Sequence, residues 1–185
     1  MPDIVESYRA HVAPKWVRVT VSRLLSATAP DHVNGLGAIV LTDSASIRRG
    51  KTHRVSGRKY TKRECRGFYH PSWRGQQAWI ELVVDNMVAD FPKPLWRVQF
   101  MRDLIISWTL FHEIGHHLHG TVASAARSSE TAANEWRERL TGLYVRKRYW
   151  YLVPLFKVVG PLYRLLRRLT SRRGRRPSGA AHRGR

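Results

Sequence analysis

Four histidines and one glutamate lie close together in the segment WTLFHEIGHHLHG, residues 108–120. His112, Glu113 and His116 form an H-E-x-x-H pattern inside an apolar stretch with helical periodicity. Because residues four apart lie on one face of a helix, both imidazoles can bind one cation through ring nitrogens. Glu113, about 100° further round the helix, can accept a proton from a metal-bound water without being a ligand. The spacing therefore predicts a hydrolytic zinc site in which Glu113 is the general base.

The residues around this pattern indicate a buried helix and not a surface helix with incidental histidines. The neighbours within and before the motif are uncharged, so polar groups among them need a partner. Gly115 lowers helix stability, and a buried glycine between two ligands predicts the close approach of another backbone. His117 points about 140° away from His112, and His119 is about 10 Å further along the helix axis. We therefore expect neither His117 nor His119 to join the metal site.

The third ligand must lie outside this segment, because a catalytic zinc usually takes three protein ligands and leaves one position open. The acidic residues downstream are Glu130, Glu135 and Glu138. Glu135 and Glu138 fall on the charged face of the next predicted helix, which is typical of solvated side chains. Glu130 begins that helix at the edge of its apolar stripe. The residues alone leave open whether Glu130 is a ligand or a first-turn glutamate favoured by the helix dipole.

The segment HEIGHHLHG, followed by ETAANEW, resembles the ImmA/IrrE family of gluzincin-type zinc metallopeptidases. In that family a second helix carries a glutamate, then an asparagine, then an aromatic residue, which correspond here to Glu130, Asn134 and Trp136. The resemblance implies that Glu130 is the third zinc ligand beside His112 and His116, and that Zn²⁺ is the cofactor. It also implies a zincin-like fold.

The resemblance covers about residues 36–145, and its specific part is the two helices. Two positions depart from the family pattern. Ala132 stands where many members carry a second acid, and Arg137 follows the aromatic residue where small residues are usual. These departures leave the metal chemistry intact and concern the substrate.

The function expected from these residues is a zinc-dependent endopeptidase that hydrolyses a peptide bond in a protein substrate, such as a regulator or repressor. Four residues are candidates for stabilising the tetrahedral oxyanion: Tyr69, His70, His119 and Tyr144. Two alternatives remain open: a non-enzymatic, basic nucleic-acid-associated module with a structural or vestigial metal site, and a zincin fold that has lost activity. A glutamate beside the first ligand has no purpose in a structural site, which favours the enzyme.

The surrounding pattern predicts an α+β fold, in which a small antiparallel sheet packs on the active-site helix and on a second, ligand-bearing helix. Residues 3–26 have the spacing of an amphipathic helix that Pro14 divides, although the alternation at residues 17–21 also suits a strand. The basic stretch 48–63 reads as a solvated connection. The active-site helix is expected over residues 95–119, with Gly120 ending it, and the second helix over about 129–148.

Three short apolar, β-branched or aromatic runs predict strands, at residues 36–42, 64–70 and 78–84. Pro71 and Gly75 mark the turn between the last two. The strand at 78–84 directly precedes the active-site helix. We therefore expect it to be the edge strand along which a substrate peptide lies extended.

Charge is distributed unevenly along the chain, which has 33 lysines and arginines and 13 acidic residues. The 47 residues after Glu138 contain 14 of the basic residues and no acidic one. We expect a metallopeptidase domain over 1–148, an aromatic and apolar segment over 149–166, and a basic, disordered tail over 167–185. Core packing is the first interpretation of the middle segment, and contact with a membrane surface is the second. The tail could bind nucleic acid or anionic lipid electrostatically.

The single cysteine, Cys65, cannot form an internal disulfide, which is typical of a reducing compartment. The N-terminus lacks the uninterrupted apolar run of a secretory signal. We therefore expect a cytoplasmic protein, with the nucleoid and the membrane surface as places to which the basic tail could bring it.

Overall fold

The computed structural model describes residues 1–47, 52–55, 58–61, 65–122 and 129–152. The chain divides into two compact units, Met1–Val145 and Arg146–Arg185. Of the second unit the structure describes residues 146–152, which include the 3-10 helix η4 (Trp150–Leu152). The predictions for the rest of the segment 149–166 and for the tail 167–185 lie outside the described residues. Within the described part of the chain, no helix is long and apolar enough to cross a membrane.

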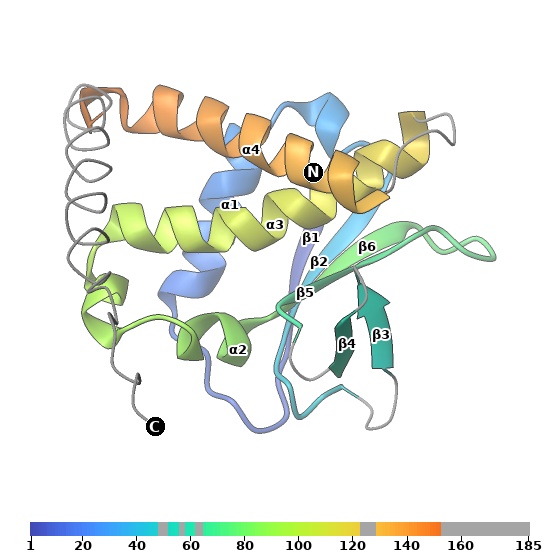
Figure 1. Cartoon of the computed structure of the whole chain (residues 1–185), viewed down its shortest axis with the longest axis horizontal. Coiled ribbons are helices and arrows are strands. Elements are labelled where there is room, and N and C mark those ends of the chain that lie inside the picture. Colours follow the sequence, from blue (N-terminus) through green and yellow to red (C-terminus); the bar gives the residue numbers. More distant parts are fainter. Residues whose placement is uncertain (48–51, 56–57, 62–64, 123–128, 153–185) are drawn as a thin grey trace, which may run out of the picture. The chain divides into compact units, whose positions relative to one another are not determined.

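The first unit has an α+β fold in which helices pack against a small mixed sheet (Figure 1). The sheet has four strands in the order β1-β2-β6-β5, and a separate hairpin pairs β3 with β4. The strands are β1 (Asp3–Ser7), β2 (Leu36–Thr42), β3 (Thr52–Val55), β4 (Arg58–Thr61), β5 (Gly67–His70) and β6 (Ala78–Val83). The helices are α1 (Trp16–Ala27), η1 (Pro30–His32), α2 (Val84–Ala89), η3 (Lys93–Arg97), α3 (Gln99–Val122) and α4 (Ser129–Arg148).

The sheet is mixed, so the prediction of an antiparallel sheet was wrong. β1 pairs with β2 and β2 with β6 in parallel, whereas β5 pairs with β6 antiparallel. The parallel pairing of β1 and β2 follows from the helix α1 between them, since parallel neighbours need a crossover connection. Residues 71–77 connect β5 to β6 and contain a tight turn, in which Arg74 and Gly75 both have positive φ and Trp73 bridges to Gln76.

The strand predicted to form the substrate-binding edge, β6, lies in mid-sheet between β2 and β5, so that prediction was wrong. Ala78, Ile80, Leu82 and Val83 on this strand are all buried. A run with so many buried apolar side chains suits a central strand better than an edge strand. The edge on this side of the sheet, among the described strands, is β5.

The N-terminal segment is a strand and not the first half of a helix. Ile4, Val5 and Tyr8 have helical spacing, but residues 3–7 pair in parallel with β2 along their whole length. The second half is the helix α1, which buries Val17, Val21, Leu24 and Leu25. The long-range pairing with β2, which local periodicity does not register, therefore decides the structure of the first segment.

Other boundaries differ locally from the predicted ones. The basic stretch 48–63 contains the hairpin of β3 and β4, where a solvated connection was expected. A short helix, α2, follows β6 and was not predicted. The active-site helix begins at Gln99, after the 3-10 helix η3, and continues past Gly120 to Val122. The bounds of α4, Ser129–Arg148, agree with the predicted helix.

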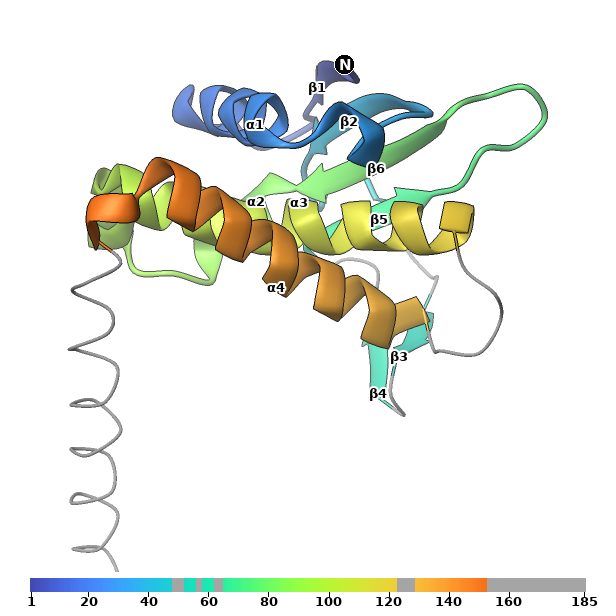
Figure 2. The same ribbon diagram turned by 90° about the horizontal axis from the view of Figure 1, so that it is seen from above.

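The core forms where α1, α3 and the sheet meet. Its fully buried side chains include Leu24 of α1, Ile39 and Ile80 of the sheet, and Leu110 and Ile114 of α3. Both views show α3 and α4 lying side by side (Figures 1 and 2). The H-E-x-x-H motif is therefore held on a helix whose one face is buried against the sheet and whose other face meets α4.

A buried carboxylate links three of these helices. Asp103 of α3 accepts hydrogen bonds from the Arg23 guanidinium of α1 and, at 2.5 Å, from the Tyr144 hydroxyl of α4. Asp103 and Tyr144 are 0% and 4% exposed. Since a buried charge is costly without a partner, these bonds fix the helices relative to one another.

Candidate metal centre

The structure brings the three predicted ligands His112, His116 and Glu130 together. His112 and His116 lie one turn apart on α3, with ring centroids 4.8 Å apart, and Glu130 lies in the first turn of α4. Nε2 of His112 and Nε2 of His116 are each 3.6 Å from a Glu130 carboxylate oxygen. One ligand atom from each of the three residues lies within 4.8 Å of the others. Glu130 thus occupies the position that the resemblance implies for the third ligand.

The spacing of these atoms fits a zinc ion. With bonds of about 2.0–2.1 Å, two ligand atoms on a tetrahedral zinc are about 3.3 Å apart. The observed 3.6 Å between each imidazole nitrogen and a carboxylate oxygen is close to this value, and the wider separations in the cluster, up to 4.8 Å, would have to close around an ion. Two nitrogens and one oxygen are also the donor set of many catalytic zinc sites, which keep a fourth position open.

The glycine between the two histidines lets α4 approach closely enough to deliver Glu130. A Cβ built on Gly115 would lie 2.7 Å from Cα and 2.8 Å from the carbonyl oxygen of Ala133 in α4. Any side chain at position 115 would therefore push backbone away. The prediction that Gly115 marks a close approach of another backbone is confirmed.

A serine that the sequence did not single out orients one of the histidines. Nδ1 of His116 lies 2.8 Å from Oγ of Ser129, and in the tautomer whose Nδ1–H donates to this hydroxyl, Nε2 is the nitrogen left to bind a metal. Nδ1 of His112, by contrast, is buried and has no hydrogen-bond partner among the described residues. A serine at the first position of the ligand-bearing helix was the available signal, but it resembles an ordinary helix start.

The electrostatic environment favours neutral imidazoles, the form that binds metal. Burial lowers the pKa of His112, and the nearby His116 and Arg137 lower it further against the opposing charge of Glu130. Burial also lowers the pKa of His116, again against Glu130. A hydrogen bond from half-buried Asn134 opposes this shift and raises the pKa of His112, but the pKa remains below its ordinary value. Both rings are therefore prepared to act as nitrogen donors near neutral pH.

Glu113 lies beside the three candidate ligands but is not one of them. It is 6% exposed, and burial followed by the negative charge of Glu130 raises its pKa to about 8, although the backbone N–H of Tyr69 donates to its carboxylate. Gly67 makes room for it, since a Cβ there would lie 2.9 Å from Oε1 of Glu113. The edge strand β5 thus contacts the Glu113 carboxylate through Gly67 and Tyr69 and holds it in place.

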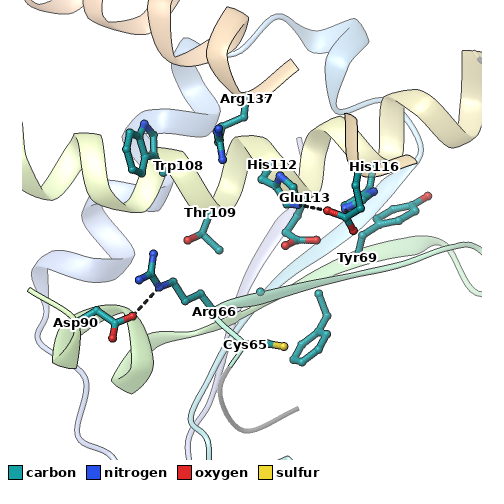
Figure 3. Close-up of a pocket in the computed structure, with 13 residues that line it drawn as sticks. Cys65, Arg66, Tyr69, Asp90, Trp108, Thr109, His112, Glu113, His116 and Arg137 are labelled. Atoms are coloured by element: carbon teal, nitrogen blue, oxygen red, sulfur yellow. Dashed lines mark hydrogen bonds and ion pairs between the residues drawn. The ribbon is translucent and has the colours of Figure 1, made fainter. Parts of the chain in front are cut away.

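These residues line a cavity of about 750 Å³ between α3, α4 and β5 (Figure 3). Its wall combines the candidate ligands and Glu113 with further residues: Cys65, Arg66, Gly67, Phe68, Tyr69, Asp90, Trp108, Thr109 and Arg137. Arg66 is already paired, since its Nε lies 2.6 Å from Oδ2 of Asp90. A polar cluster with perturbed pKa values in a cavity of this size is a candidate for substrate binding and chemistry.

The other two histidines of the motif are absent from the cluster, as the sequence predicted. His117 is 3% exposed and donates from Nε2–H to the carbonyl oxygen of Asn34 at 2.8 Å. Its Nδ1 then accepts the hydroxyl proton of Tyr69 at 3.2 Å. His119 is half-buried and does not line the described pocket.

Of the four oxyanion candidates, only Tyr69 lines the described pocket. Its hydroxyl donates to His117, however, so the side chain points along the wall. His70 stacks on Trp79 and pairs with Glu81 at 3.2 Å, and Tyr144 is buried against Asp103. His70 and Tyr144 therefore have structural partners away from the candidate metal centre.

Comparisons of the chain with protein-family models, with curated proteins and with solved structures found no match.

Proposed function

We propose that this chain is a zinc-dependent metallopeptidase of the gluzincin type, with a zincin-like arrangement of its active-site helices. The observation that carries the proposal is the meeting of His112, His116 and Glu130, from two helices, beside a buried carboxylate that is not one of them. A structural zinc site is usually closed by four ligands, whereas the cluster in the described residues has three. This difference favours an enzyme over a non-enzymatic module.

Each residue around the candidate centre has a proposed role in hydrolysis. A zinc ion, when bound, would polarise the scissile carbonyl and lower the pKa of its water. Glu113, whose carboxylate form a bound cation would favour over the acid, accepts the proton of the attacking water and then passes it to the leaving amine as the peptide bond breaks. Gly67 and Tyr69 hold the Glu113 carboxylate from the side of β5.

The substrate is proposed to be an extended segment of a protein. β5 is the outer strand of the sheet on the side of the cavity, and three of its residues, Gly67, Phe68 and Tyr69, line that cavity together with the preceding Arg66. An edge strand offers backbone N–H and C=O groups to an added strand. A regulatory protein remains the proposed class of substrate.

Paired variants test the proposal. Glu130→Ala removes one of three ligands, so we expect it to lose most of its zinc in a metal analysis after dialysis. Glu113→Gln keeps all three ligands, so it should keep zinc while hydrolysis of an unfolded protein such as casein falls by about 100-fold or more. Glu138→Ala is the matched control, because Glu138 lies on the same helix with a side chain 78% exposed.

Two results would contradict the assignment. Full zinc retention in Glu130→Ala would remove Glu130 from the ligand set. Undiminished hydrolysis by Glu113→Gln would show that another group activates the water.

A further inference from the structure

The two helices that form the candidate metal centre continue past it as facing rows of side chains. Along α3 the row is His116, His112 and Trp108, spaced by four residues, and α4 runs antiparallel to it. Ser129 bonds to His116 near one end of the pair, and Arg137 lies over Trp108 near the other. Figure 3 shows Trp108 and Arg137 together beside His112. The cavity therefore extends from the metal centre to a tryptophan–arginine pair.

Arg137 is the cation of this cavity that lacks a strong partner among the described residues. Its Nε is buried without a hydrogen-bond partner there, and its nearest carboxylate, the exposed Glu138, is 3.7 Å away. Arg66 on the other wall is neutralised by Asp90 at 2.6 Å and packs over Phe91. A half-buried guanidinium with no closer carboxylate among the described residues is a site for an anion.

Trp108 fixes the guanidinium in this place. The Cζ atom of Arg137 is 5.5 Å from the centre of the indole ring, which holds the cation by its π face. Trp108 is itself 51% exposed although it lies on a helix whose other face is buried, so the ring forms part of the cavity wall. Contact through the face of the indole leaves the in-plane N–H donors of the guanidinium free of the ring, and a carboxylate binds a guanidinium in that plane.

The distance from the metal centre limits which part of a substrate can reach this pair. Four residues of helix separate His112 from Trp108, which is about 6 Å along the axis. Neighbouring residues of an extended peptide are about 3.5 Å apart, and a side chain adds to this reach. A group bound at Arg137 therefore belongs to a residue next to the scissile bond.

We propose that Arg137 and Trp108 form a carboxylate-binding subsite, which makes the enzyme prefer a peptide with a carboxylate next to the scissile bond. The proposal rests on the proposed peptidase function. The carboxylate can come from an aspartate or glutamate side chain or from the C-terminus of the substrate. The chemistry is the same in both cases, a bidentate pair with the guanidinium.

A binding experiment tests the subsite without catalysis. Acetylated peptide amides that differ only by glutamate or glutamine are titrated into the metal-free protein and followed by NMR. We expect the glutamate peptide to bind about tenfold more tightly, as a charge-assisted hydrogen bond implies. Arg137→Gln should abolish the difference. Arg139→Gln is the matched control, because Arg139 also stacks on a tryptophan, Trp136, but does not line the described pocket.

Hydrolysis supplies the second readout and separates the two sources of the carboxylate. The zinc-loaded enzyme is given the same peptide pair with glutamate on either side of the cleavable bond, and a pair ending in a free acid or an amide. Preference for internal glutamate assigns a side chain, and preference for the free acid assigns a terminal carboxylate. In Arg137→Gln the ratio of kcat/KM within each pair should fall to about one.

The outcomes distinguish this subsite from the other possibilities. If Arg137 instead stabilised the oxyanion, Arg137→Gln would slow all peptides equally and leave the ratios unchanged, which overturns the subsite. Equal or undetectable binding of both peptides, together with equal kcat/KM, also overturns it. Discrimination in binding that depends on Arg137, with no hydrolysis of any peptide, would uphold the subsite and reject the peptidase function.

Discussion

At the scale of single residues, the candidate centre depends on how each imidazole is oriented as much as on which residues are present. His116 has a fixed orientation, because Ser129 accepts its Nδ1–H at 2.8 Å. Nδ1 of His112 is buried without such a partner among the described residues, and the polar side chain that interacts with this ring is Asn134. The two histidines of the motif are therefore held by different partners on α4, and Ser129 is the one that orients His116.

Replacing Ser129 should weaken metal binding without removing a ligand. In Ser129→Ala the His116 ring loses its acceptor and can rotate away from Glu130, so we expect zinc affinity to fall by about tenfold or more. Competition with a chromophoric chelator measures this affinity. Ser26→Ala serves as the control, since Ser26 is exposed on α1 and its hydroxyl bonds only to its own helix. Equal affinities in the two variants would show that Ser129 does not orient His116.

The residue types of the centre could be predicted from the sequence, whereas their supporting partners could not. His112, Glu113 and His116 are recognisable because the chemistry fixes their spacing on one helix. Glu130 needed a family resemblance, since a first-turn glutamate has a common structural explanation. Ser129, Gly67 and Arg137 act through contacts between elements distant in the chain, and no local spacing reports such contacts.

At the scale of elements, the packing of α4 on α3 decides whether Glu130 reaches the histidines. The contact is tight at Gly115, where a Cβ would meet the backbone of Ala133 at 2.7 Å and Cβ of Trp136 at 3.1 Å. Backbone cannot move aside as a flexible side chain can. The distance between the two helix axes is therefore set by the absence of a side chain at position 115.

A methyl group at this position should separate the helices. In Gly115→Ala the higher helix propensity of alanine favours α3 by about 1 kcal/mol, but the clash with Ala133 opposes it and displaces Glu130. We expect lower stability in urea unfolding and weaker zinc binding in the same variant.

Gly142→Ala is the matched control on α4, because a Cβ there meets nothing within 4 Å among the described residues. It should raise the free energy of unfolding by up to about 1 kcal/mol and leave zinc affinity unchanged. A Gly115→Ala variant that behaves like Gly142→Ala would show that the helices can adjust without moving Glu130.

Elements were predictable where local pattern and tertiary context agree. β2 and α4 follow from an apolar run and a helical stripe and have the predicted bounds, whereas β6 ends one residue early and β5 covers only residues 67–70 of the predicted strand 64–70. The prediction of a helix over β1 was wrong because pairing with β2 outweighs the helical spacing of this segment. The prediction that β6 is an edge strand was wrong because the order of strands along the chain does not give their order in the sheet. The sheet thus places β5, not β6, beside the cavity.

At the scale of the whole first unit, a second buried carboxylate joins the N-terminal segment to the sheet. Asp43, directly after β2, is 0% exposed and accepts hydrogen bonds from the backbone N–H groups of Arg9, Ala10 and His11 through Oδ2. Its other oxygen accepts the hydroxyl of Ser46. Asp43 therefore anchors the segment that leads from β1 to α1.

This anchor should make stability depend on pH. Burial alone would raise the pKa of Asp43, but the hydrogen bonds from Ser46 and from the three backbone N–H groups lower it well below its ordinary value. Because the folded-state pKa is below the unfolded value of about 3.9, the carboxylate stabilises the fold above about pH 4. That contribution is lost as the pH falls further. In Asp43→Asn we expect unfolding free energy at pH 7 to drop by about 2 kcal/mol.

Urea unfolding should be measured on the metal-free protein at pH 7, 5 and 3. Protonation of the candidate metal ligands then cannot change stability through the loss of bound metal. The deficit of Asp43→Asn should be full at pH 7 and 5 and should shrink at pH 3, where the native carboxylate begins to lose its advantage. Asp31→Asn, at an exposed position in η1, controls for the change of one charge. A deficit that stays constant down to pH 3 would mean that the shape of the side chain, and not its charge, holds the N-terminal segment on the sheet.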